Sequence, residues 1–118
     1  MTQTIRLFIF FEAAAFIAAA LTHFGLLIDG FKHLKAGIAE SVIVFVLLVG
    51  LALTWIRPGL TRGFGLAAQT FALLGTLVGI FTIAIGVGPR TMPDIAYHIV
   101  IVPVLLAGVL IGRRTGAV

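Results

Sequence analysis

The sequence predicts an all-α integral membrane protein, folded as a four-helix up-and-down bundle with both termini in the cytoplasm. Of its 118 residues, 61% are hydrophobic and only 10% are charged, and the mean hydropathy is +1.25. A soluble domain would carry about 25% charged residues. The apolar residues also fall in runs of about 20, the length of helix that crosses a bilayer. These observations exclude a water-soluble fold and make the lipid bilayer the first expected partner.

Four apolar segments define the expected elements. We predict one transmembrane domain over residues 1–118, with helices at about 7–28, 36–56, 63–87 and 94–112. Each break between them contains Gly or Pro together with a charged residue, as turns between helices do. Because all three connections are short, consecutive helices should be antiparallel neighbours in one bundle.

The basic residues predict the orientation of the bundle. The eight Lys and Arg residues lie singly or in pairs at the ends of the apolar runs, which favours lipid headgroups over nucleic acid as their partner. Five lie on the side of the termini and three on the other side, a bias that places both termini in the cytoplasm, at the inner membrane of a bacterium. The five are Arg6, Arg57, Arg62, Arg113 and Arg114, and the three are Lys32, Lys35 and Arg90.

The absence of cysteine limits the chemistry available to the chain. Without thiols there is no disulfide framework, no thiolate metal site and no covalent attachment of haem through a CxxCH motif. Any bound metal would therefore need histidine, carboxylate, methionine or hydroxyl ligands.

Three ionisable residues are expected at one depth near the side opposite the termini. His23 precedes the predicted end of its helix by five residues, while Glu40 and His98 each follow a predicted helix start by four. At a rise of about 1.5 Å per residue, all three lie roughly 6 to 8 Å below the same surface. Charged groups inside a membrane need compensation and often mark function.

Asp94 and His33 extend this group. Asp94 lies one helical turn before His98 and could orient its imidazole. We predict a metal site formed by His23, Glu40 and His98, supported by His33 and Asp94, for zinc, iron or manganese. Bis-imidazole ligation of haem b by His23 and His98 is the other cofactor expected. No HExxH motif is present, and an interfacial position, where polar side chains reach water, explains the same pattern without a cofactor.

Glu12 is a separate feature of the first predicted helix, because it lies deep among apolar neighbours. One interpretation makes it a structural carboxyl that contacts Gln69 or Arg62. The other makes it a proton-binding carboxylate on a proton pathway.

Small and aromatic residues suggest packing and anchoring roles. Gly75 and Gly79 form a GxxxG pattern that permits close helix approach. Trp55 and Tyr97 lie near opposite interfaces, where aromatic side chains anchor membrane helices.

Three functions follow as hypotheses. The first is a membrane protein that binds a metal ion or haem for electron transfer or a small redox reaction. The second is a small proton-coupled transporter or channel that uses Glu12. The third is an accessory subunit of a larger membrane complex. Four short helices bury little surface, so a homo-oligomer or a larger assembly is expected in each case, and nucleic acid in none.

Overall fold

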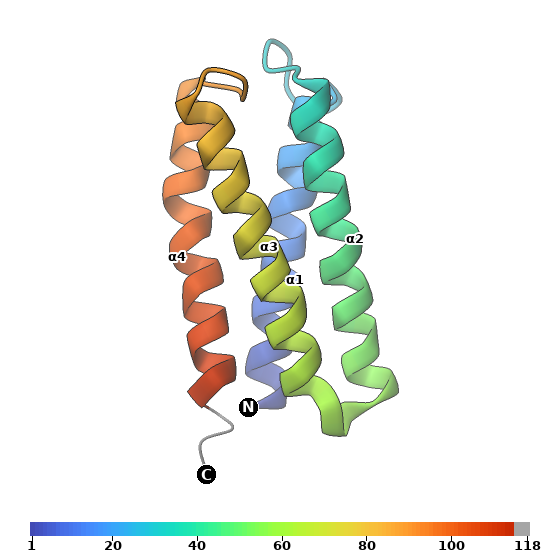
Figure 1. Ribbon diagram of the computed structural model, residues 1–118. Helices are drawn as coiled ribbons and strands as arrows, with labels where there is room; N and C mark the ends of the chain where they lie inside the picture. The colour runs from blue at the N-terminus through green and yellow to red at the C-terminus, as the bar shows by residue number, and fades with distance from the viewer. Residues whose placement is uncertain (115–118) are drawn as a thin grey trace.

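The computed structural model describes residues 1–114 as four long helices in an up-and-down bundle (Figure 1). The elements are α1 (Thr2–His23), α2 (Leu34–Ile56), a short 3-10 helix η1 (Pro58–Leu60), α3 (Thr61–Ala84) and α4 (Met92–Arg114). All four long helices are long and apolar enough to cross a membrane. The predicted four-helix architecture is confirmed for this part of the chain. Residues 115–118 of the expected 1–118 domain lie outside the described residues.

The two ends of the bundle differ in what they carry. The N-terminus, η1 and the last turn of α4 lie together at one end (Figure 1). The α1–α2 and α3–α4 connections lie at the opposite end, here called the distal end. Every ionisable residue predicted for the metal site belongs to the distal half.

Glycine ends two helices earlier than the hydropathy predicts. α1 ends at His23 rather than near residue 28, because Gly25 adopts a φ of +78°. The N–H groups of Gly25 and Leu26 bond the carbonyls of Thr22 and Leu21 at 3.0 and 2.9 Å, the Schellman pattern that stops a helix. Gly86, with a φ of +85°, ends α3 at Ala84 in the same way. Hydropathy alone does not register such a stop, since the residues that follow are still apolar.

Each helix turns a stripe of residues toward its neighbours. The inward stripe of α1 recurs every three or four residues, as expected for one helical face, and contains Ile5, Ile9, Glu12, Ala13, Phe16, Ala20 and His23. The stripe of α4 contains Asp94, Ile101, Leu105, Gly108 and Gly112. Both stripes bury polar residues as well as apolar ones, so the bundle interior is not uniformly apolar.

Small residues set how closely the helices approach. A Cβ added to Gly50 would lie 2.7 Å from the Ala68 side chain, so α2 and α3 are in near-backbone contact there. The expected packing role holds for Gly75, where a Cβ would lie 3.1 Å from Ile43. At Gly79, one turn closer to the distal end, the nearest neighbour of such a Cβ is His98 Nε2 at 3.7 Å. Gly79 therefore leaves space beside His98, at the wall of a cavity.

Candidate functional site

Three of the predicted residues meet at the distal end. His23 contacts a carboxylate with each ring nitrogen: Nδ1 bonds Glu40 Oε1, and Nε2 lies 2.7 Å from Asp94 Oδ1. The three side chains come from α1, α2 and α4, and their exposed fractions are 7%, 12% and 6%. We call Glu40, His23 and Asp94 the distal triad. Within residues 1–114, the structure shows ion pairs at this place alone.

Local sequence features place the triad. His23 is the last residue on the inward stripe of α1, and its carbonyl accepts the His33 backbone N–H at 2.8 Å, which closes the α1–α2 connection. Asp94 lies in the first turn of α4 and accepts the backbone N–H of Thr91 at 3.1 Å and the Thr91 hydroxyl. An acid that caps the start of its own helix is a common helix-initiation device. Asp94 thus holds α4 and His23 at once.

The charge of the triad follows from the ionisation of its acids. When both acids are ionised, their oxygens only accept hydrogen bonds, so both nitrogens of His23 act as donors. The triad then contains one imidazolium and two carboxylates, and one of the four carboxylate oxygens, Glu40 Oε2, is buried without a partner. Two acids bound to one cation leave acceptor capacity free at Glu40.

His33 has a structural role at the start of α2. Its Nδ1 accepts the Ala36 backbone N–H at 3.1 Å, and its Nε2 lies 3.3 Å from the Val87 carbonyl oxygen. It therefore caps α2 and contacts the α3–α4 connection. Its ring centroid lies 6.3 Å from that of His23, but neither of its nitrogens remains free.

The second ring nitrogen of His98, Nε2, is near Gly79 of α3 at the cavity wall. Its Nδ1 lies 2.6 Å from the Asp94 carbonyl oxygen, and because that oxygen only accepts, Nδ1 carries the hydrogen. In a neutral ring Nε2 is then an acceptor, and it is directed at Gly79 of α3. His98 thus offers a hydrogen-bond acceptor to the space between α3 and α4.

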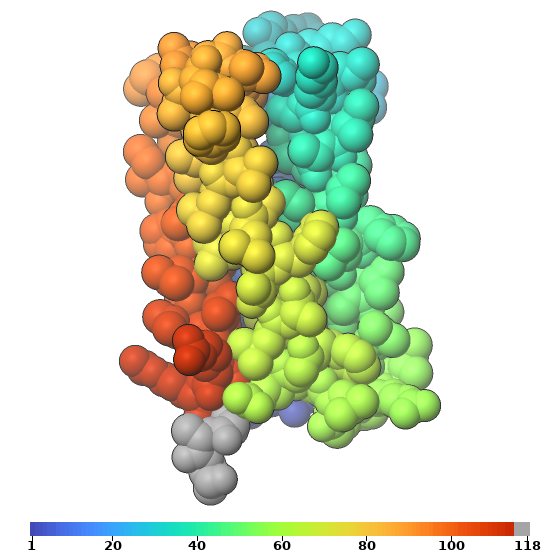
Figure 2. Space-filling view, viewed as in Figure 1, coloured from blue at the N-terminus to red at the C-terminus, as the bar shows by residue number. Residues whose placement is uncertain are grey.

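A cavity of about 240 Å³ lies between these residues in the distal half of the bundle. Its lining is mostly apolar and comes from all four helices, with Phe16 and Ile43 among the lining side chains. In the space-filling view, a furrow separates α3 from α2 toward the distal end (Figure 2). Ala36 and Ala39 on α2 and Gly79 on α3 keep this side open. This furrow lies on the side of the bundle (Figure 2), between two of the helices long and apolar enough to cross a membrane.

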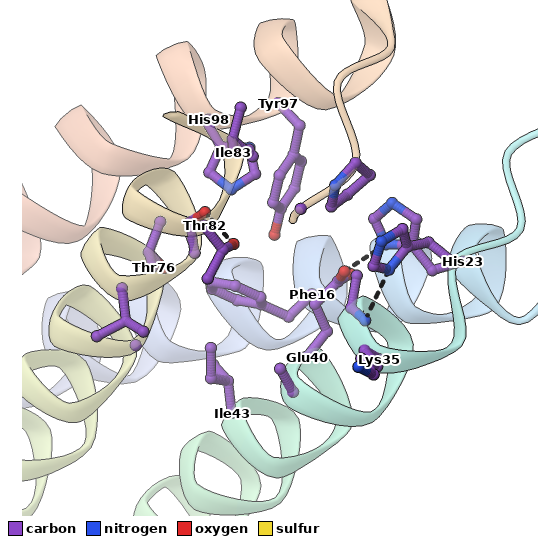
Figure 3. A pocket seen from close by; sticks show the side chains of 18 of the residues that line it. Phe16, His23, Lys35, Glu40, Ile43, Thr76, Thr82, Ile83, Tyr97 and His98 are labelled. Atoms are coloured by element: carbon purple, nitrogen blue, oxygen red, sulfur yellow. Dashed lines mark hydrogen bonds and ion pairs between the residues drawn. The ribbon is translucent and has the colours of Figure 1, made fainter. Parts of the chain in front are cut away.

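Tyr97 points its hydroxyl into this space from α4 (Figure 3). Its ring packs edge-on against Phe16 and His98, with centroid separations of 5.8 and 5.7 Å. The hydroxyl is buried and has no hydrogen-bond partner, like the Glu40 Oε2 atom across the cavity. A buried tyrosine hydroxyl usually finds a partner, so these two orphaned atoms are the unusual feature of the site.

The five predicted metal ligands do not form one metal-binding set. Within residues 1–114, no group of three or more His, Asp and Glu side chains is arranged to hold a metal ion. Three of the five expected ligands bind one another in the triad, His33 caps a helix, and His98 lies on the α4 wall of the cavity. Bis-imidazole binding of haem needs a free nitrogen on His23, and both are bonded. The metal or haem centre stays a prediction without an assembled ligand set in this part of the chain.

Glu12 lies away from the cavity, at the middle of the bundle. It is 0% exposed, and neither of its carboxyl oxygens has a hydrogen-bond partner. Gln69 of α3, also 0% exposed, leaves its Oε1 unpartnered, while its amide nitrogen donates to the Gly65 carbonyl at 3.2 Å. A Cβ on Gly108 of α4 would lie 1.8 Å from Gln69 Oε1 and 3.1 Å from Glu12 Oε2. Both oxygens thus converge on one glycine, and we call Glu12 and Gln69 the central pair.

Arg62, the other partner expected for Glu12, binds elsewhere. Its Nε donates to the Gly112 carbonyl at 2.8 Å, at the end of α4. Of the two structural contacts expected for Glu12, only the neighbourhood of Gln69 is present.

Sequence reasoning missed Tyr97, which it treated as an interfacial anchor. The spacing of α4 holds a signal that identifies it: Asp94, Tyr97, Ile101 and Leu105 recur every three or four residues, and the other three are buried. Tyr97 therefore lies on the inward stripe of α4, where a hydroxyl needs an interior partner.

Comparison of the chain with protein-family models, with curated proteins and with solved structures found no match.

Proposed function

We propose that this protein binds a small lipophilic molecule with a hydrogen-bonding head group, which enters the distal cavity sideways from the bilayer. The observation that carries the proposal is the pair of buried, unpartnered polar atoms, the Tyr97 hydroxyl and Glu40 Oε2, on two residues that line a mostly apolar cavity. Ligand sites typically combine an apolar lining with a few convergent polar groups. An apolar cavity of about 150 Å³ suffices to bind benzene, so the larger volume here accommodates a head group and the first part of a chain.

The test uses a matched pair of glycines on α3. Gly79 borders the cavity, whereas a Cβ on Gly63 would meet nothing within 4 Å. A photoreactive fatty alcohol should label cavity-lining peptides of α2 and α3 in the wild type, and Gly79→Leu should abolish this labelling by filling the space. Gly63→Leu should label as the wild type does. Equal labelling of the wild type and Gly79→Leu would refute the proposal.

The orientation and location remain part of this proposal. Five basic residues near the termini against three at the distal end support a cytoplasmic position for the termini. The cavity would then open near the outer leaflet of a bacterial inner membrane. Thiol-reactive labelling of a single cysteine introduced at Gly30, in the α1–α2 connection, tests this: an impermeant reagent added to intact cells should modify it.

The functions predicted from the cofactor hypothesis and from Glu12 have less support. The proton-coupled transporter needs a route to Glu12, and Glu12 is not among the residues that line the cavity. The accessory-subunit and homo-oligomer hypotheses stay predictions, which the mass of the detergent-purified particle would test.

A further inference from the structure

The polar atoms around the cavity have a definite hydrogen-bonding character. Glu40 Oε2 belongs to a carboxylate whose other oxygen binds His23, so it can only accept. In a neutral ring His98 Nε2 also accepts, because Nδ1 then carries the hydrogen and donates to the Asp94 carbonyl. The Tyr97 hydroxyl can donate once and accept. These three groups therefore offer two acceptors and one hydroxyl that needs both a donor and an acceptor.

A head group must match this set to remove the cost of the unpaired atoms. A carbonyl or an ether only accepts, so it could satisfy Tyr97 but would leave Glu40 Oε2 without a donor. A hydroxyl both donates and accepts, so one such group can donate to Glu40 and accept from Tyr97. A ligand without a donor would leave Glu40 Oε2 buried and unpaired, and this energetic cost lets the site reject such a ligand.

An ammonium head fits the same atoms less well. An ammonium group donates hydrogen bonds and accepts none, so it offers no acceptor for the hydrogen of the Tyr97 hydroxyl. A cationic side chain, Lys35, already lines the same cavity with Glu40. The site therefore does not depend on the ligand for positive charge.

We infer that the distal cavity selects lipophilic alcohols or phenols, whose hydroxyl donates to Glu40 Oε2 and accepts from Tyr97. This inference rests on the proposed function and adds the ligand class. The apolar chain or ring would lie along Phe16 and Ile43 and leave through the opening between α2 and α3. His98 Nε2 is placed to accept from a second hydroxyl, as a diol or a hydroquinone would supply.

The experiment compares head groups on one photoreactive chain: a primary alcohol, its methyl ether and the corresponding amine. Labelling of cavity peptides is measured by mass spectrometry on the full chain in lipid nanodiscs. The alcohol should compete at about tenfold lower concentration than the ether, the ratio expected for one hydrogen bond to a charged acceptor. Tyr97→Phe, which keeps the ring, should weaken labelling by the alcohol and the ether alike, because both accept from the Tyr97 hydroxyl. Glu40→Gln, which removes the charged acceptor, should reduce the preference for the alcohol, and Phe11→Leu on the lipid-facing side of α1 should preserve it.

The outcomes separate the ligand class from the proposed function. Equal labelling by alcohol and ether, or stronger labelling by the amine, would overturn the hydroxyl assignment while leaving the cavity occupied. Labelling of the cavity by none of the three would overturn the proposed function itself. A preference for the alcohol that disappears in Glu40→Gln supports both.

Discussion

Polar groups are buried at two levels of this bundle, the distal triad at one end and the central pair roughly 16 Å further along α1. Each level includes one residue from the inward stripe of α1: His23 belongs to the triad and Glu12 to the central pair. In the triad, each His23 nitrogen has a carboxylate partner, and a cavity lies alongside. In the central pair, three oxygens lack donors, and two of them, Gln69 Oε1 and Glu12 Oε2, lie next to Gly108.

The difference separates two uses of a buried acid. Charges that bind each other hold three helices together and still leave Glu40 Oε2, which is buried, without a hydrogen-bond partner. Within residues 1–114 Glu12 has no counter-ion; it is fully buried, and its Oε2 packs beside Gly108 of α4. The following predictions test whether the triad depends on charge and the central pair on shape.

His23→Ala should have the largest effect, because it leaves two buried carboxylates without their cation. Removing one partner of a buried ion pair costs about 3 to 5 kcal/mol. The free energy of unfolding in mixed detergent micelles, followed by circular dichroism, should fall by that order. Adding Asp94→Asn should recover part of the loss, since it removes one of the uncompensated charges. A double variant as unstable as the sum of the single changes would contradict this account of the triad.

Glu40→Gln should lower stability by about 1.5 to 3 kcal/mol, the contribution of a hydrogen bond to a charged group. The amide oxygen can still accept from His23, but the charge is lost. The same unfolding measurement applies, with Thr82, which also lines the cavity, changed to Ser as the matched control. No loss of stability would mean that Glu40 and His23 do not interact as an ion pair.

Gly108→Ala should destabilise the bundle by about 1 to 3 kcal/mol, as overpacking does. The new methyl group would occupy the position of Gln69 Oε1, which lies 1.8 Å from it. Gly63→Ala is the control, since its methyl group meets nothing within 4 Å and alanine favours a helix. Equal effects of the two changes would show that α4 does not approach Gln69 this closely.

Glu12→Gln should have the smallest effect, within about 0.5 kcal/mol of the wild type or slightly stabilising. The carboxyl has no bonded partner to lose, and glutamine has the same shape. This is the same substitution as at Glu40, so the two results compare the two levels directly. A loss as large as that of Glu40→Gln would reveal a charge partner for Glu12.

The sequence predicts the helices and much of the triad for simple physical reasons. Runs of about 20 apolar residues specify the spans, and the cost of polar groups in a membrane singles out His23, Glu40 and Asp94. Equal depth correctly suggested that residues from different helices meet. Depth carries no information about rotation around each helix axis, so it also included His98, and His33 was added although it lies outside that layer. Neither residue joins the triad.

The cavity could not be predicted from the sequence. It depends on how α2 and α3 separate toward the distal end (Figure 1), and on small residues such as Gly79 and Ala39 in its lining. The role of His33 as a cap depends on where α1 stops, which the positive φ of Gly25 decides. Such features arise from packing between distant segments rather than from local composition.

The sideways opening between α2 and α3 has a consequence for how any occupant is measured. A molecule that arrives through it travels by two-dimensional diffusion in the leaflet and never passes through water. Its occupancy follows its mole fraction among the surrounding lipids rather than its aqueous concentration. At a constant total amount of probe, adding unlabelled lipid lowers the mole fraction of the probe, and the occupancy of the cavity should fall with it.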